Sequence, residues 1–198
     1  MSSAWVVVTG GGTGIGRALV HHFSRSHNVL TAGRRRSLLL DTQRLAPVPA
    51  SVVVVACDIG CPEGREALTR SLPADAHIAL VIHNAAIGDP GSVRDLDVQH
   101  FEDALRVNVV APLALSQSLL AGLERASGRI LHLGTSVAFH PQLGTASYGV
   151  SKMAFHRLYQ RACEAGLRAY HLWTARIILC LLTQRPCVRL PCFRRIQC

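Results

Sequence analysis

Short runs of aliphatic and β-branched residues recur along the chain, and polar segments separate them. The apolar positions within each run are nearly continuous instead of strictly alternating, which is typical of parallel strands that helices cover on both faces. The pattern therefore predicts the strands of one parallel sheet. The expected strands occupy residues 4–9, 28–33, 51–58, 78–84 and 128–135, followed by a sixth over residues 166–173.

The segments between the runs have the spacing of helices. Ile15, Leu19 and Phe23 recur at four-residue intervals, and Pro62 is suited to the first turn of a shorter helix. Longer helices are expected over residues 100–125 and 148–166. This alternation predicts an α/β fold with a doubly wound parallel sheet (Rossmann-like) in a single domain. Its ligand crevice is expected at the carboxyl ends of the strands.

Composition places the chain among folded globular proteins. Of its 198 residues, 49% are hydrophobic, and no run approaches the ~20 apolar residues that cross a membrane. The first residues lack the basic region of a signal peptide and lead directly into the first expected strand. We therefore expect a cytoplasmic protein that does not interact with membranes.

Charge and cysteine content suggest neither nucleic-acid binding nor a metal site. The net charge is +9, but five arginines lie in the last 25 residues, so residues 1–173 carry only +4. Most other arginines are scattered, unlike those of a nucleic-acid-binding surface. The seven cysteines form no CxxC pair and are interpreted as free thiols.

A glycine-rich turn follows the first expected strand. Residues 9–16 read TGGGTGIG and lead into the first expected helix. Glycines permit a sharp turn and let backbone N–H groups approach a phosphate at the helix N-terminus. The spacing differs from GxGxxG, and no GK[ST] follows to complete a P-loop. A dinucleotide-binding turn is favoured here, the alternative being a tight connection without a ligand.

Taken with Asp58, HNAA (83–86), VNVVAP (107–112) and YGVSK (148–152), this turn resembles the short-chain dehydrogenase/reductase family. The motifs occur in the family's order between about residues 4 and 173. HNAA stands where the family usually has NNAG, so His83 and Ala86 depart from the pattern. The residues that the resemblance places at the nucleotide are Gly10, Gly14, Ile15, Gly16, Arg34, Asp58, Ile59, Asn84, Ala85, Tyr148 and Lys152.

The tyrosine and lysine of YGVSK have the spacing of residues on one helix face. Lys152 is the only lysine among the 21 lysines and arginines. An ammonium ~5 Å from Tyr148 contributes about 3 kcal/mol at an effective dielectric of ~20 toward lowering the phenol's pKa. The alternative is an ordinary exposed helix pair. The resemblance implies that Tyr148 is the general acid in hydride transfer to a small carbonyl, or the base in the oxidation of an alcohol.

Two further positions are implied by the resemblance. A hydroxyl before Tyr148 orients the carbonyl; Ser136 is favoured, and Thr135 is the alternative one residue earlier. Asn108 is expected to anchor a helix distortion and a water of the family's proton relay. Its alternative role is that of an ordinary buried polar residue.

The end of the second expected strand, TAGRRRS, bears on cofactor choice. NAD-preferring relatives carry an acidic residue where this chain has Gly33, and Arg34 follows directly. A guanidinium donates charge-assisted hydrogen bonds to phosphate, so NADP is the expected cofactor. The alternative is that the arginine run is only a solvated basic loop.

The resemblance fails after residue 173. Residues 174–198 contain no Pro-Gly turn and no acid, but four cysteines and five arginines. We interpret this segment as an atypical tail that replaces the family's substrate loop and last strand, the alternative being a merely divergent ending. Two functions remain: an active NADP-dependent reductase, or an inactive relative that binds nucleotide or pairs with full-length subunits. In the family, subunits often associate through the helices that correspond to those of Asn108 and Tyr148. By this analogy a homo-oligomer is expected.

Overall fold

A computed structural model describes residues 4–164, 169–173 and 194–195, with side chains over 4–160. Strands and helices alternate along the chain, as the sequence pattern predicts. The strands are β1 Trp5–Thr9, β2 Asn28–Gly33, β3 Val52–Ala56, β4 Ile78–His83, β5 Arg129–Gly134, β6 Ala169–Trp173 and β7 Arg194–Arg195. The helices are α1 Gly14–Phe23, α2 Arg36–Arg44, α3 Pro62–Arg70, α4 Val98–Leu105, α5 Ala111–Arg125 and α6 Ala146–Glu164. Shorter 3₁₀ or π turns are η1 Pro49–Ser51, η2 Arg106–Val110 and η3 Ser136–Ala138.

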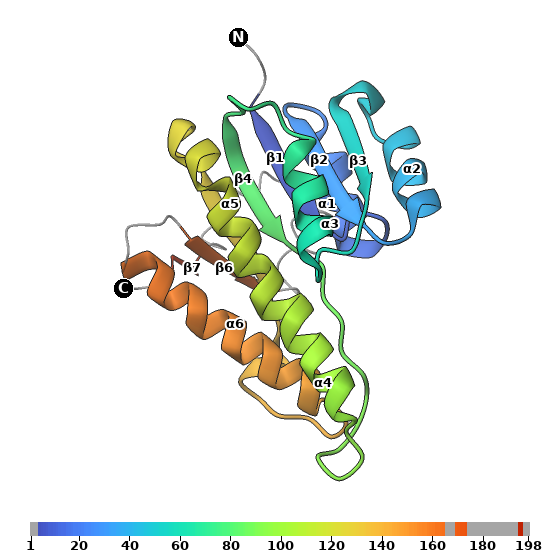
Figure 1. The fold of residues 1–198 in the computed structure, drawn as a ribbon, viewed down its shortest axis with the longest axis vertical. Helices are drawn as coiled ribbons and strands as arrows, with labels where there is room; N and C mark the ends of the chain where they lie inside the picture. Colours follow the sequence, from blue (N-terminus) through green and yellow to red (C-terminus); the bar gives the residue numbers. More distant parts are fainter. Residues whose placement is uncertain (1–3, 165–168, 174–193, 196–198) are drawn as a thin grey trace.

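The strands form one sheet in the order β3-β2-β1-β4-β5-β6-β7 (Figure 1). Strands β1 to β6 are parallel. From β1 the chain builds the sheet outward through β2 to β3, then crosses back so that β4 lies on the other side of β1 and β5 and β6 follow. This doubly wound, Rossmann-like architecture confirms the predicted fold class. A ligand crevice forms where the connections diverge, at the carboxyl ends of β1 and β4.

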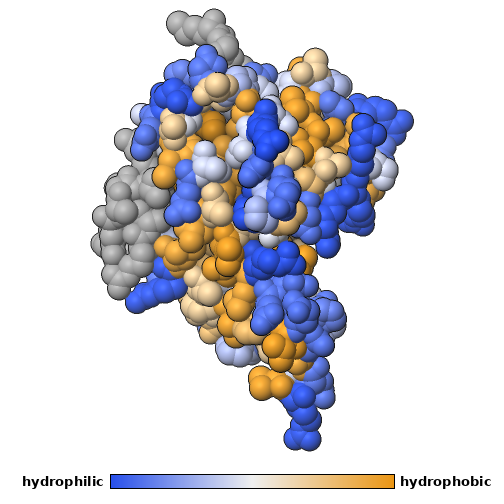
Figure 2. Space-filling model, in the orientation of Figure 1, coloured by the Kyte–Doolittle hydropathy of each residue, from blue (hydrophilic) through white to orange (hydrophobic). Residues whose placement is uncertain are grey.

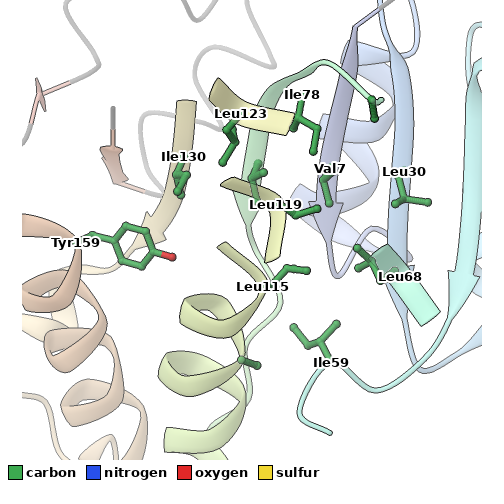
Figure 3. Close-up of a cluster of buried hydrophobic side chains, with 14 of the residues drawn as sticks. Val7, Leu30, Ile59, Leu68, Ile78, Leu115, Leu119, Leu123, Ile130 and Tyr159 are labelled. Carbon is green, nitrogen blue, oxygen red and sulfur yellow. The ribbon is translucent and has the colours of Figure 1, made fainter. Parts of the chain in front are cut away.

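Helices cover both faces of the sheet. On one face, Val6 and Val8 pack with Leu19 and Val20 of α1. On the other, Val7 and Leu30 belong to a larger cluster that includes residues of α3, α5 and α6 (Figure 3). The alternation of Val6, Val7 and Val8 between the two clusters explains why the strands are apolar at nearly every position.

The longest predicted helix contains a break in its regular hydrogen bonding. Residues 98–125 form α4, the π turn η2 and α5 in succession. The stretch is long and apolar enough to span a membrane by composition, but 44% of its apolar window is buried within the fold. In this structure it packs against β4 and α6.

Two details differ from the sequence interpretation. The arginine run is not wholly a loop, because Arg36 begins α2, a helix that buries Leu39 and was not predicted. The usual last strand was expected to be missing; in the described residues, the place beyond β6 holds only the two-residue β7, which pairs antiparallel. The unpaired backbone of an edge strand can pair with any segment that reaches it.

Candidate active site

The glycine turn is built by close backbone contacts between β1 and β4. Gly10 has φ +74, and a Cβ there would lie 2.9 Å from the Ala85 Cα. A Cβ on Gly16 would lie 2.1 Å from the Gly10 carbonyl oxygen. The Asn84 side-chain amide donates to the carbonyls of Thr9 (2.9 Å) and Gly10 (3.0 Å). Both glycines are therefore required, and Asn84 holds the turn in place.

A second brace, which the sequence analysis missed, holds the middle of the turn. Arg17 donates through Nε and Nη2 to the Gly12 carbonyl (3.1 and 2.6 Å) and through Nε to the Thr42 hydroxyl (3.0 Å). Thr42 donates in turn to the Gly11 carbonyl at 2.9 Å. An arginine in the first turn of a helix opposes the helix dipole, so it needs carbonyl partners. That conflict is the signal that could have singled out Arg17.

A cleft of about 380 Å³ opens above this turn. Its walls come from the segments that follow β1, β2, β3 and β4, where the carboxyl ends of the strands meet. The structure brings nine predicted nucleotide-binding residues together in its lining: Gly10, Gly14, Ile15, Gly16, Arg34, Asp58, Ile59, Asn84 and Ala85. Tyr148 and Lys152, predicted to bind the same nucleotide, are not part of that lining.

One end of the cleft is basic, and the lining of the cleft includes residues that were not predicted. Arg34 and Arg35 are exposed and line the cleft beyond β2. Asp58 lies opposite and accepts from the Gly60 backbone N–H at 2.8 Å. Among the unpredicted lining residues is Cys57, and burial raises the pKa of its thiol to about 11, so the thiol is neutral in this wall.

The Tyr148 and Lys152 side chains lie on the same side of α6. The Lys152 Nζ is 5.6 Å from the centroid of the Tyr148 ring and donates to the Leu133 carbonyl of β5 at 3.1 Å. Lys152 is only 3% exposed. Tyr148 packs so closely on Gly88 that a Cβ there would lie 2.7 Å from its own Cβ. The pair is therefore not the ordinary exposed helix pair that was the alternative.

The expected fall in the Tyr148 pKa does not occur in the protein alone. Burial raises the pKa of Tyr148 above its usual value. Burial also lowers the pKa of Lys152 to about 8, so part of the lysine population is neutral near physiological pH. A nearby ammonium favours the phenolate, but desolvation of both groups opposes their charged forms, and desolvation prevails here.

Asn108 links the cleft wall to α6. It lies in the π turn η2 and is 1% exposed. Its Oδ1 accepts from the Ile87 N–H at 2.9 Å, while its Nδ2 donates to the Ile87 carbonyl (2.6 Å) and to the Ser151 hydroxyl (2.9 Å). Ile87 lines the cleft. The expected helix distortion is present, and Ser151 is a partner that the sequence analysis did not identify.

The two candidate hydroxyls occupy different environments. Thr135 caps η3, its hydroxyl accepting from the Val137 N–H at 3.4 Å. Ser136 is the first residue of η3 and is exposed. Neither residue lines the cleft of about 380 Å³.

Comparison with known proteins decides the family. The sequence matches the profile described as short chain dehydrogenase over residues 4–169. The chain belongs to the short chain dehydrogenase family. This match spans the glycine turn, the cleft and α6, so the residues described above lie within the family's domain.

Among relatives of this short chain dehydrogenase is "Short chain dehydrogenase penD" of Penicillium thymicola. It is 28% identical over 160 residues, which cover 75% of this chain and 58% of the relative. Among solved structures, one neighbour is described as a putative NAD(P) dependent gluconate 5-dehydrogenase from Beutenbergia cavernae, with bound NADP at low occupancy. It is 27% identical with a TM-score of 0.77, over 87% of this chain and 72% of that one. A metagenomic short-chain oxidoreductase in complex with NADP shares the fold, with a TM-score of 0.81 and 21% identity over 92% and 90% of the two chains.

This short chain dehydrogenase spans 58% of the length of its Penicillium relative. The described residues of the segment predicted to be an atypical tail, 174–198, are Arg194 and Arg195 alone. The rest of that segment, expected to replace the family's substrate loop and last strand, lies outside the described residues.

Proposed function

We propose that this chain is an oxidoreductase that transfers hydride between NADP(H) and a small carbonyl or alcohol substrate. The observation that carries the proposal is the cleft at the carboxyl ends of β1 to β4, with the glycine turn on one side and exposed Arg34 at one end. A Cβ on Gly14 would meet no atom within 4 Å, so open space lies beside this turn at the N-terminus of α1. A phosphate fits such a place.

The choice of NADP rests on charge. Gly33 offers no carboxylate to hold an adenosine ribose, and the guanidinium of Arg34 is available to a 2′-phosphate. The two similar solved structures that carry NADP in their descriptions support the same choice. When bound, the nicotinamide supplies or accepts the hydride.

The residues of α6 and its surroundings supply proton transfer. Tyr148 would donate a proton to the carbonyl oxygen in reduction and accept it back in oxidation. Ser136 would orient that oxygen, because the Thr135 hydroxyl already caps η3. Lys152 would bind the nicotinamide ribose and stabilise the phenolate of Tyr148. Asn108 would hold the loop after β4 at a constant distance from α6, through its hydrogen bonds to Ile87 in that loop and to Ser151 on α6.

The direct test measures binding and turnover separately. NADPH fluorescence reports binding, and loss of absorbance with a panel of aldehydes and ketones reports turnover. We expect NADPH to bind and at least one carbonyl to be reduced. Binding without turnover across the panel would favour the alternative, an inactive relative that binds nucleotide or pairs with full-length subunits. Absence of NADPH binding would overturn the reductase and the nucleotide-binding relative, and would leave only pairing with full-length subunits.

Arg34→Ala is expected to remove most of the preference for NADPH over NADH. The lost charged hydrogen bond is worth roughly 1.5–3 kcal/mol, or about ten- to a hundredfold in dissociation constant. Arg36→Ala is the matched control, because Arg36 is also exposed but begins α2 and does not line the cleft. Equal affinities of the unmodified chain for NADPH and NADH would contradict the assignment.

Ser136→Ala and Thr135→Val are expected to have different effects where the unmodified chain turns over. Ser136→Ala should lower kcat by about tenfold or more with little change in stability, because it removes an exposed hydroxyl near the reacting oxygen. Thr135→Val should lower the unfolding free energy by about 1 kcal/mol, the value of a helix cap. Kinetics and chemical denaturation distinguish the two. The opposite pattern would assign the substrate contact to Thr135.

A cytoplasmic homo-oligomer is the proposed assembly. Hydrophobic side chains gather over α5 and α6 on the face shown in Figure 2. Leu113 on α5 is 38% exposed, and Val150 on α6 is 52% exposed. A second copy would cover such side chains and gain from their burial.

A further inference from the structure

The side chains of Arg17 and Thr42 meet two successive carbonyl groups of the glycine turn. The Gly12 carbonyl accepts from the Arg17 Nε at 3.1 Å and from its Nη2 at 2.6 Å. The Gly11 carbonyl accepts from the Thr42 hydroxyl at 2.9 Å. Arg17 also donates to the Thr42 hydroxyl at 3.0 Å, so the two side chains form one hydrogen-bonded unit. Thr42 is fully buried, and neither side chain lines the cleft.

The single hydrogen of the Thr42 hydroxyl is needed most by Gly11. The Leu38 carbonyl also lies 2.9 Å from this hydroxyl. Leu38 belongs to α2, however, so its carbonyl has the helical N–H four positions later as its regular donor. Gly11 is buried and outside any helix, and among the described residues no backbone N–H donates to its carbonyl. Without the hydroxyl, that buried carbonyl would lose its hydrogen bond.

These contacts fix the direction of two N–H groups in the same peptides. A trans peptide is planar, and its C=O and N–H point in opposite directions. Because the Gly11 carbonyl faces Thr42, the N–H of Gly12 faces away from Thr42. Because the Gly12 carbonyl faces Arg17, the N–H of Thr13 faces away from Arg17. Gly12 and Thr13 both line the cleft, and in the described part of the chain neither N–H has a backbone acceptor.

We propose that Arg17 and Thr42 are positioning residues for the two linked phosphates of a nucleotide. By holding two carbonyls of the turn away from the cleft, they present the N–H groups of Gly12 and Thr13 to the phosphates. Glycine peptides rotate with little steric cost, so an unheld turn could direct a carbonyl toward the anion. A carbonyl oxygen repels a phosphate, whereas an N–H donates a charge-assisted hydrogen bond to it.

The role of this pair rests on the proposed function only in that the cleft binds a nucleotide. It depends neither on the nicotinamide nor on a 2′-phosphate. The guanidinium of Arg17 also adds positive charge near the turn, so its replacement changes charge and orientation together. Thr42 is neutral. Thr42→Val removes the donor to Gly11 at constant charge and nearly constant shape, and Thr42→Ser keeps that donor.

ADP is the probe, because it carries two linked phosphates but neither the nicotinamide nor the 2′-phosphate. Adenosine 2′-monophosphate is the comparison, because its phosphate belongs at Arg34. Titrations of ¹⁵N-labelled protein followed by NMR measure both affinities, and the amide signals of Gly12 and Thr13 should move with ADP. We expect Arg17→Met and Thr42→Val to weaken ADP binding by about tenfold or more, and to leave the affinity for adenosine 2′-monophosphate within about twofold. Thr42→Ser should restore ADP binding.

Two controls carry matched changes away from the turn. Arg25→Met removes an exposed arginine just beyond the end of α1. Ser24→Ala removes a hydroxyl of a residue that is 2% exposed, which donates to the His21 carbonyl. Neither control should change the affinity for ADP or for adenosine 2′-monophosphate. Chemical denaturation establishes that every variant is folded.

A merely structural role would loosen α2 and weaken both probes alike, because Arg34 shortly precedes that helix. Equal losses for the two probes, unchanged ADP affinity in folded Thr42→Val, or no ADP binding by the unmodified chain would overturn the inference. If Arg17→Met does not fold, the contrast between Thr42→Val and Thr42→Ser decides. The same contrast decides if the unmodified chain does not bind adenosine 2′-monophosphate, a result that would contradict the NADP assignment alone.

NADPH binding and turnover are measured separately. ADP binding that depends on Thr42, without NADPH binding, supports this inference and contradicts the proposed function. NADPH turnover with ADP affinity unchanged in Thr42→Val does the reverse.

Discussion

Tyr148→Phe is expected to lower the rate of carbonyl reduction by about 10²–10⁴-fold, the usual contribution of a positioned general acid. NADPH binding should stay within about twofold, because phenylalanine keeps the ring that packs on Gly88 and removes only the hydroxyl. Steady-state kinetics and NADPH fluorescence measure the two quantities on the same preparation.

The outcome separates chemistry from folding. A loss of both turnover and NADPH binding in Tyr148→Phe would show that the hydroxyl holds the site together instead of transferring a proton. Near-normal turnover would remove Tyr148 from the mechanism. Either result would leave the family assignment intact, because that rests on the match over residues 4–169.

Lys152→Arg is expected to abolish turnover, weaken NADPH binding and lower the unfolding free energy by about 1–3 kcal/mol. The position is 3% exposed and has room for a compact ammonium that donates to the Leu133 carbonyl. A guanidinium is planar and larger, so it overpacks the site and cannot reproduce this contact. Denaturation, kinetics and NADPH fluorescence provide the measurements, and Lys152→Met separates the loss of charge from the change of shape.

The pH dependence of the same site has a definite sign. Because burial lowers the pKa of Lys152 to about 8, the ammonium is present below that pH and lost as the pH rises through it. NADPH affinity of the unmodified chain should therefore decline above about pH 8. Any affinity that remains in Lys152→Arg should not decline there, because a guanidinium stays charged.

Near-normal rates in Lys152→Arg would mean that the lone lysine has no special role.

Much of the candidate site was predictable because it depends on local chain geometry. The end of β1, the glycine turn and the N-terminus of α1 are consecutive in sequence. In addition, parallel strands bring their carboxyl ends to one edge of the sheet. Gly16, Arg34 and Asp58 therefore line one cleft, as expected. Arg17 and Thr42 were not predicted, because they act by hydrogen bonding to each other and to carbonyls of the glycine turn. Only the folded loop directs those carbonyls toward them.

The amino-acid pattern by itself determined the doubly wound sheet, the cleft at its switch point and the placement of Tyr148 and Lys152 on one helix face. Periodicity and glycine spacing are local properties, so these features follow without knowledge of distant contacts. Only the tertiary structure decided the protonation of the site. Burial raises the pKa of Tyr148 and lowers that of Lys152, against the simple attraction of a nearby charge. It also decided that His83, Ser116 and Tyr159 meet, because β4, α5 and α6 come together only when the core packs.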